Sequence, residues 1–306
     1  MCGASRRWHT SRPFRIRAGR VPSNMLAQAL HDACVQEIAA ADAALAAAAR
    51  NPHRRVHQAR KALRRARVLL ALIARADPAF AAVDAKLRRA ARSLSRLRDA
   101  AVAVETFTWL MKRKALRGTV DASVPLRDDL VRCRDLLLAE HRRDDPGFVN
   151  LRRYLQRARD AASALSWSHA DPRAVARGLA RSRRRIAKID EHARRSNEEH
   201  VRHRWRRRLR RYSDQHALIA EILGPNGGCD GADAGELLRR LSRKGLLDAA
   251  ADKRLAATAH ALGLEHDARL LRQIVRKTHV LDEGIRTQLL SALDHRLHKL
   301  HKRCEG

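Results

Sequence analysis

One nine-residue pattern occurs twice in this chain, and it restricts the fold more than any other feature of the sequence. The first copy begins at His57 and the second at His203. In each copy the histidine is followed by basic residues at positions +3, +4, +7 and +8 and by a leucine at +6. Neither copy contains glycine or proline, and the spacings of three and four residues match the turn of an α-helix. We therefore expect two helices, each with a row of cations along one face.

Apolar residues accompany both copies with the same helical period. At about 100° per residue they lie roughly opposite the cations. One side of each helix should therefore pack in a core while the other side presents positive charge. The apolar positions are Val56, Ala59, Leu63, Ala66, Leu70 and Ile73 in the first helix, and Val201, Trp205, Leu209, Tyr212, His216 and Ile219 in the second.

The rest of the chain is also typical of helices, and no run of alternating β-branched residues predicts a strand. Proline and glycine mark the expected helix ends. One long helix should run from Pro78 to about Arg117, and later helices should break near Gly245 and Gly263. The sequence therefore predicts an all-α fold.

A second repeated signature divides the chain in two. Leu97-Arg98-Asp99 follows the first basic helix, and Glu265-His266-Asp267 follows the second. Each half thus contains a helix, a basic helix, a long helix with this aspartate, and a closing helix, which predicts two pseudo-symmetric four-helix bundles. The expected domain covers residues 23–303, with halves at about 23–167 and 171–303. Residues 1–22 are expected to form a flexible basic arm; an upstream mis-start of the reading frame is the alternative interpretation.

The charge of the chain points to its partner. Its 306 residues include 65 Lys and Arg but only 33 Asp and Glu, so the formal charge is +32, while 45% of the residues are hydrophobic. This hydrophobic content is enough for a core, yet the charge opposes compaction by self-repulsion. We infer that a polyanion stabilises the folded state by binding to it.

The cysteines and the apolar runs indicate the cellular compartment in which the protein is expected. The five cysteines are scattered and form no CxxC pair, which favours a reducing, cytoplasmic setting. The apolar runs are too short to cross a bilayer, so no membrane association is expected. Arg6-Arg7 is followed by no hydrophobic segment, so no signal peptide is expected.

Together the two basic motifs and the two aspartate signatures resemble those of the CHAD domain, an all-α family named for its conserved histidines. The resemblance covers about residues 23–303. It implies two helical bundles around a central basic channel that binds inorganic polyphosphate without catalysis, and it leaves association with polyphosphate granules open. Many members carry Tyr-Gln at +11 and +12 of the second motif, where this chain has Asp214 and Gln215.

When the site residues of the family are carried over by position, the resemblance implies which residues of this chain line the channel. His57, Arg60, Lys61, Arg64 and Arg65 come from the first half, and His203, Arg206, Arg207, Arg210 and Arg211 come from the second, with Arg181, Arg184 and Arg185 on the preceding helix. Arg98, Asp99, His266 and Asp267 are expected to support them, the aspartates by pairing with neighbouring arginines. Arginine binds phosphate oxygens in pairs, and phosphate should raise the pKa of a nearby histidine, so binding should strengthen as pH falls.

Three alternative functions remain. The charge also fits a nucleic-acid binder, but only 3% of the residues are aromatic, which leaves few platforms for base stacking. Metal chemistry would use histidines such as His295, His298 and His301, yet neighbouring cations repel divalent ions, so no specific metal or cofactor is expected. A phosphate-chain hydrolase would need clustered carboxylates, and Asp99 and Asp267 are far apart in sequence. Non-catalytic polyphosphate binding is thus the primary prediction, and nucleic-acid binding through charge, expected to be weak beside it, is the alternative.

Overall fold

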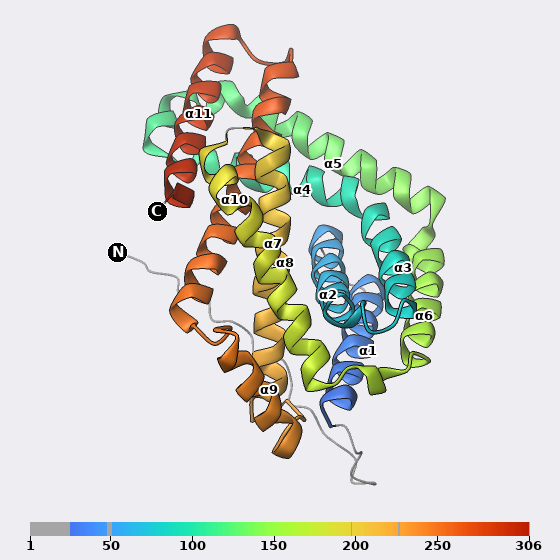
Figure 1. The fold of residues 1–306 in the computed structure, drawn as a ribbon. Helices are drawn as coiled ribbons and strands as arrows, with labels where there is room; N and C mark the ends of the chain where they lie inside the picture. Colours follow the sequence, from blue (N-terminus) through green and yellow to red (C-terminus); the bar gives the residue numbers. More distant parts are fainter. Residues whose placement is uncertain (1–24, 48–50, 197, 226, 306) are drawn as a thin grey trace.

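The computed structural model describes residues 25–47, 51–196, 198–225 and 227–305, and the predicted basic arm at residues 1–22 lies outside them. Within these ranges the chain forms eleven α-helices and no strand, which confirms the all-α prediction (Figure 1). The first predicted half contains six helices and the second contains five, where four were predicted in each. The α-helices are α1 (Met25–Ala46), α2 (Pro52–Ile73), α3 (Ala79–Ser93), α4 (Ser95–Met111), α5 (Val124–Asp144), α6 (Val149–Ser163), α7 (Pro172–Arg195), α8 (Glu199–Leu223), α9 (Gly231–Arg243), α10 (Ala249–Lys277) and α11 (Glu283–Glu305). Short 3-10 helices cover Lys114–Thr119, Asp121–Ser123, Pro146–Phe148 and Trp167–His169.

Polar side chains cap α2 and α7. Asn51 accepts hydrogen bonds from the backbone nitrogens of His53 and Arg54, each at 3.1 Å, and Pro52 occupies the first turn of α2. Asp171 caps α7 in the same way, with Pro172 in the first turn. Both caps satisfy backbone donors that the first helical turn leaves without partners, and they place α2 and α7 at defined starting points.

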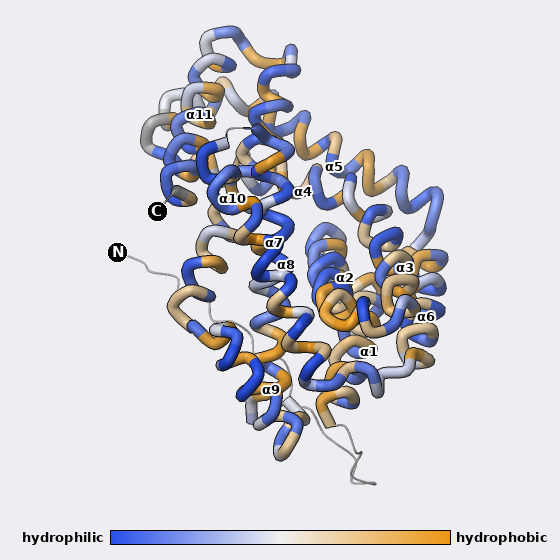
Figure 2. The backbone as a smooth tube through the Cα atoms, in the orientation of Figure 1, coloured by the Kyte–Doolittle hydropathy of each residue, from blue (hydrophilic) through white to orange (hydrophobic). Residues whose placement is uncertain are grey.

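The predicted apolar stripes are buried. Every member of the two stripes is at most 5% exposed except His216, which is half-buried and lies 2.8 Å from Asp252 Oδ2. Trp205 and Tyr212 are in the core, as their position on the apolar side predicts. In the tube coloured by hydropathy, α2 and α8 each contain both hydrophilic and hydrophobic residues (Figure 2). The hydrophobic period of the two basic helices therefore determines which side of each faces the core.

Two hydrophobic cores hold the molecule together, and neither follows the predicted halves. The larger core contains residues of all eleven α-helices described. The second joins Phe107 of α4 and Leu126 of α5 to Leu271 of α10 and Leu293 of α11. Helices of both predicted halves thus contribute to each core, and the pseudo-symmetry of the halves stays a prediction.

Two predicted helix limits are wrong. The segment from Pro78 to Arg117 is not one helix, because it divides at Leu94, and the last part forms a 3-10 helix. At Gly263 no break occurs: α10 continues through it, since tertiary packing outweighs the small helix penalty of a single glycine. The break near Gly245 is confirmed, and this glycine adopts a positive φ of 60°.

The helices α7 and α2 approach each other closely at Gly178. A Cβ atom added to Gly178 would lie 2.2 Å from the backbone oxygen of Leu72. Only glycine allows this separation, because any side chain would overlap the backbone of α2. Arg181, one turn further along α7, donates a hydrogen bond to the same oxygen at 3.1 Å. This crossing sets the distance between α2 and the α7–α8 pair.

Candidate functional site

The two helices that carry the repeated motif lie side by side although they are far apart in sequence. Arg64 Nε of α2 donates to Asp214 Oδ2 of α8 at 2.7 Å. Gln215 of α8 donates to the backbone oxygen of Val68 in α2 at 3.0 Å. Asp214, where the second motif departs from the family pattern, and Gln215, where it keeps the glutamine, thus link the basic helices directly.

Most arginines of α2 already have partners inside the protein. Arg60 donates to the backbone oxygen of Ala91 and, at 2.8 Å, to Ser95 Oγ. Because the chain breaks at Leu94, the Ala91 oxygen is free to accept from Arg60 rather than from a continuing helix. The α2 row is therefore largely a set of links to neighbouring helices.

Arg65 is the most strongly engaged member of the α2 row. It donates to the carboxylates of Glu37 in α1 and Glu221 in α8. Burial lowers the pKa of Arg65, but the hydrogen bonds to Glu221 and Glu37 outweigh it and raise the pKa overall. Lys61 differs from these arginines, since it is exposed and forms no ion pair with any described residue.

The motif arginines of α8 are arranged differently, because none of Arg206, Arg207, Arg210 and Arg211 forms an ion pair with a described residue. Seven of the eight residues that line a pocket between α7 and α8 are cations or histidines. The pocket has a volume of about 530 Å³, and only His200 has a carboxylate of a described residue within ion-pair distance, Glu198 at 3.3 Å. It is lined by Ser182, Arg185, His200, His203, Arg204, Arg207, Arg208 and Arg211. We call this the α7–α8 pocket.

A second group of α8 arginines points toward α4 and α10. Burial and the charge of Arg64 lower the pKa of Arg210 to about 10. Burial also lowers the pKa of Arg206, whose Nε is buried without an acceptor among the described residues. Both guanidiniums therefore lie where positive charge exceeds the available negative charge.

Asp99 and Asp267 lie close to this group, as expected of supporting residues. Burial raises the pKa of both carboxyls, while the positive charge of Arg206 opposes the rise in each. Arg98 opposes it as well, and this arginine pairs with Glu105 at 2.8 Å. The direct arginine pairs expected for the two aspartates are absent among the described residues. The fold thus brings Asp99 of α4 and Asp267 of α10, which are far apart in sequence, close to Arg206.

The motif histidines are electrostatically suited to remain neutral in the free protein. Burial and the charge of Arg98 lower the pKa of His57, and burial with Arg206 and Arg207 lowers that of His203. The rings of His203 and His266 lie 5.4 Å apart, and burial, Arg206 and His203 lower the pKa of His266 to about 4. An approaching anion would shift these equilibria toward the charged form.

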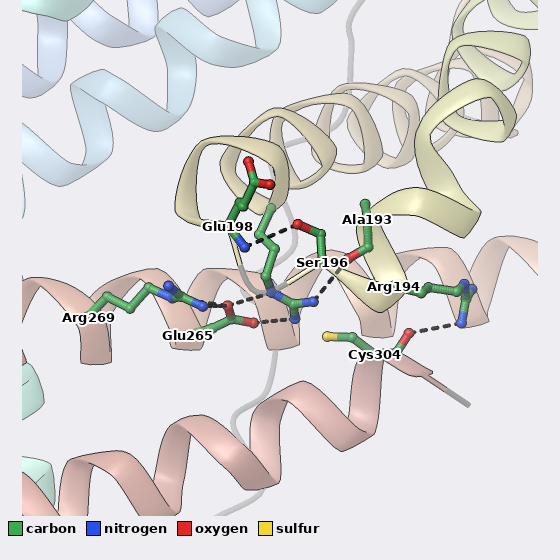
Figure 3. A network of polar contacts seen from close by, with 8 residues as sticks. Ala193, Arg194, Ser196, Glu198, Glu265, Arg269 and Cys304 are labelled. Carbon is green, nitrogen blue, oxygen red and sulfur yellow. Dashed lines mark hydrogen bonds and ion pairs between the residues drawn. The ribbon is translucent and has the colours of Figure 1, made fainter.

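A buried ion pair joins α8 to α10, the helices that carry His203 and His266 (Figure 3). Arg202 and Glu265, with side chains 2% and 3% exposed, each precede one of the two histidines in sequence. Arg202 also donates to the backbone oxygen of Ala193, and Glu265 accepts from Arg269 at 2.9 Å. The network satisfies both buried charges and fixes α8 against α10, which positions the His203 and His266 rings.

The sequence model of the CHAD domain family matches residues 29–276, more than half of the chain. The chain therefore belongs to the CHAD domain family. Among solved structures, the crystal structure of the CHAD domain from the plant Ricinus communis is similar to it: the two are 17% identical, the match covers 95% of this chain and 91% of that chain, and the TM-score is 0.49. No curated protein sequence matches the chain. The family inferred from the four motifs is confirmed.

This CHAD domain gathers the predicted site residues into two sets rather than one. His203, Arg207, Arg211 and Arg185 line the α7–α8 pocket, whereas Arg206 and Arg210 face Asp99 and Asp267. On α2, Arg60, Arg64 and Arg65 are held by neighbouring groups. Arg181 and the exposed Arg184 lie on α7 beyond the pocket, and neither is one of its lining residues.

Sequence reasoning missed four lining residues of the pocket: Ser182, His200, Arg204 and Arg208. The signal that could have found them is the spacing of four between His200, Arg204 and Arg208, which places them on one strip of α8. The repeated pattern defines positions +3, +4, +7 and +8, and this strip lies beside those positions on α8.

The described part of the CHAD domain contains no group of three or more His, Cys, Asp or Glu arranged to hold a metal ion. Across the same residues, none of the helices combines the length and the apolar character needed to span a membrane.

Proposed function

We propose that this CHAD domain binds inorganic polyphosphate and does so without catalysis. The observation that carries the proposal is the α7–α8 pocket, where five arginines and two histidines converge around about 530 Å³ and the arginines have no carboxylate partner among the described residues. Such a cluster is electrostatically unfavourable on its own and becomes favourable when an anion enters.

Inorganic polyphosphate suits this pocket because its charge is dense and repeated. Arginine forks donate to phosphate oxygens in pairs, and neighbouring forks on a helix contact successive groups about every 5.4 Å. The lining includes no phenyl or indole ring on which a nucleobase could stack. The pocket chemistry therefore favours a bare phosphate chain over nucleic acid, which is the second class that its charge admits.

The proposal that binding is non-catalytic rests on the surroundings of the two carboxylates that meet at the site. Asp99 and Asp267 both lie near Arg206, whose charge repels divalent cations. Enzymes that cleave phosphate chains use carboxylates to hold such cations. A cytoplasmic setting and association with polyphosphate granules remain part of the proposal.

Competition binding tests the ligand class. Long-chain polyphosphate should displace a labelled DNA duplex from the protein at far below equal mass, and the affinity for polyphosphate should fall steeply as salt rises. DNA that displaces polyphosphate more readily than the reverse would favour the nucleic-acid alternative. Release of phosphate from polyphosphate in the presence of Mg²⁺ or Mn²⁺ would contradict the non-catalytic part of the proposal.

Two arginine substitutions of equal charge separate binding from structure in the same assay. Arg207→Gln removes an exposed pocket arginine and should weaken polyphosphate binding with little change in stability. Arg65→Gln removes a guanidinium held by Glu37 and Glu221, so it should lower the free energy of unfolding by about 1–2 kcal/mol and affect affinity less. Equal losses of affinity in both variants would show that only total charge matters.

A further inference from the structure

The first two-thirds of α7 carry positive charge that no acidic residue of the same segment balances. Between Pro172 and Lys188 the helix carries six arginines and one lysine and no acidic residue. The ion pairs of α7 all lie further along, where Arg194 pairs with Asp190 and Arg195 with Glu191. None of the seven cations in the first part has a carboxylate of a described residue within ion-pair distance.

A second arginine-rich helix shows that this arrangement is not the rule for exposed arginines here. On α5 the arginines alternate with acidic residues: Arg127 pairs with Asp128 at 3.1 Å and Arg132 with Asp129 at 3.2 Å. Such a mixed surface is the ordinary solvated face of a helix. The unpaired row on α7 is therefore a distinct feature.

The α7 row is continuous with the α7–α8 pocket. Arg185 lines the pocket, and Arg181 and Arg177 follow at intervals of four residues, so the three lie along one strip. From Arg185 to Arg177 the helix advances about 12 Å. Arg184 lies beside this strip and is exposed.

Arg181 ties the strip to the end of α2. Its guanidinium donates to the Leu72 backbone oxygen, which brings it near Arg75. Burial lowers the pKa of Arg181, and the neighbouring charges that lower it further are those of Arg75, Arg185, Arg177 and Arg184. Positive charge thus continues without interruption from the pocket across α7 to the end of α2.

We propose that the anion site of the pocket continues as a surface track along Arg185, Arg181 and Arg177 to Arg75. The track rests on the proposed function and specifies its ligand class: a linear phosphate chain long enough to leave the pocket and follow α7. A short phosphate such as inorganic triphosphate fills the pocket alone. The track itself presents no aromatic side chain, so it contacts a phosphate backbone and does not stack nucleobases.

The test uses one double variant on the track and one matched double variant elsewhere. Arg75→Gln/Arg177→Gln removes two exposed charges of the track and leaves every lining residue of the pocket in place. Arg127→Gln/Arg132→Gln removes two exposed charges from α5, so both proteins lose the same net charge. Thermal unfolding should show that both variants are folded, and the track variant should be at least as stable as the wild type because like charges are removed.

Affinities for inorganic triphosphate and for long-chain polyphosphate are then measured for the three proteins over a range of salt concentrations. We expect wild-type protein to bind the long chain more tightly than triphosphate. The track variant should lose about fivefold or more in long-chain affinity and about one unit of salt slope per lost contact, while its triphosphate affinity stays unchanged. The α5 variant should match the wild type with both ligands.

Several results would overturn the track, and they differ from failure of the proposed function. Equal long-chain losses in the track and α5 variants would show a general charge effect. Equal wild-type affinity for triphosphate and the long chain would show that nothing beyond the pocket contributes. If a single-stranded oligonucleotide competed better than polyphosphate and lost affinity in the same track variant, the occupant would be nucleic acid. If wild-type protein bound neither phosphate, the proposed function would fail and the track with it.

Discussion

His266 makes the pH dependence of the site testable at the level of one side chain. Its pKa is about 4 in the free protein because of burial and the charges of Arg206 and His203, so it is neutral near pH 7. A bound phosphate raises the pKa of His203 and His266, and the complex then holds more protons than the free protein. Affinity for polyphosphate should therefore rise as pH falls from 8 to 6.

The controls for this prediction separate the histidines from the other titrating groups. Burial also raises the pKa of Asp99 and Asp267, so both carboxyls stay in place in the variant that tests the histidines. Long chains keep nearly all of their units charged, so the ligand itself changes little. A His203→Asn/His266→Asn variant should have a flatter pH profile, and equal wild-type affinity at pH 6 and pH 8 would contradict the histidine contribution.

At the scale of elements, the crossing of α7 over α2 depends on one glycine. Gly178→Ala would place a Cβ atom 2.2 Å from the Leu72 oxygen and 2.9 Å from the Leu72 carbonyl carbon, so the helices must separate. Overpacking of this kind should lower the free energy of unfolding by about 1–3 kcal/mol in urea titrations. Polyphosphate affinity should also fall, because the same crossing sets the spacing between α2 and the pocket.

Gly263 supplies the matched control for Gly178→Ala. It lies inside α10 with no atom within 4 Å of an added Cβ, so Gly263→Ala should raise stability by about 0.5–1 kcal/mol. If both variants were more stable than the wild type, the close approach at Gly178 would be wrong.

The element scale also shows what the sequence could predict and what it could not. Hydrophobic periodicity correctly assigned the buried and cationic sides of α2 and α8, because that pattern is local to each helix. The sequence did not predict that the arginines of α2 are paired while the motif arginines of α8 are not. This difference depends on carboxylates such as Asp214 and Glu221, which belong to α8 and pair with arginines of α2. The break at Leu94 was missed for a related reason, since Arg60 of α2 takes the carbonyl that a continuing helix would use.

Over the whole molecule, the excess positive charge should dominate the response to salt. Because the unpaired cations of α7 and α8 repel one another, the thermal midpoint without ligand should rise as NaCl is added and screens them. Polyphosphate at low salt should raise the midpoint further by binding the folded state. A midpoint that falls with NaCl would show that the ion pairs stabilise the fold more than the repulsion destabilises it.

The second hydrophobic core has a consequence for synthesis on the ribosome. Phe107 and Leu126 pack against Leu271 and Leu293, which are translated much later. The nascent chain must therefore carry α4 and α5 with their apolar sides uncovered until α10 and α11 emerge. Chaperones that recognise exposed apolar helices should engage the growing protein in this interval, and chains that stop before α10 should aggregate rather than persist as a folded first half.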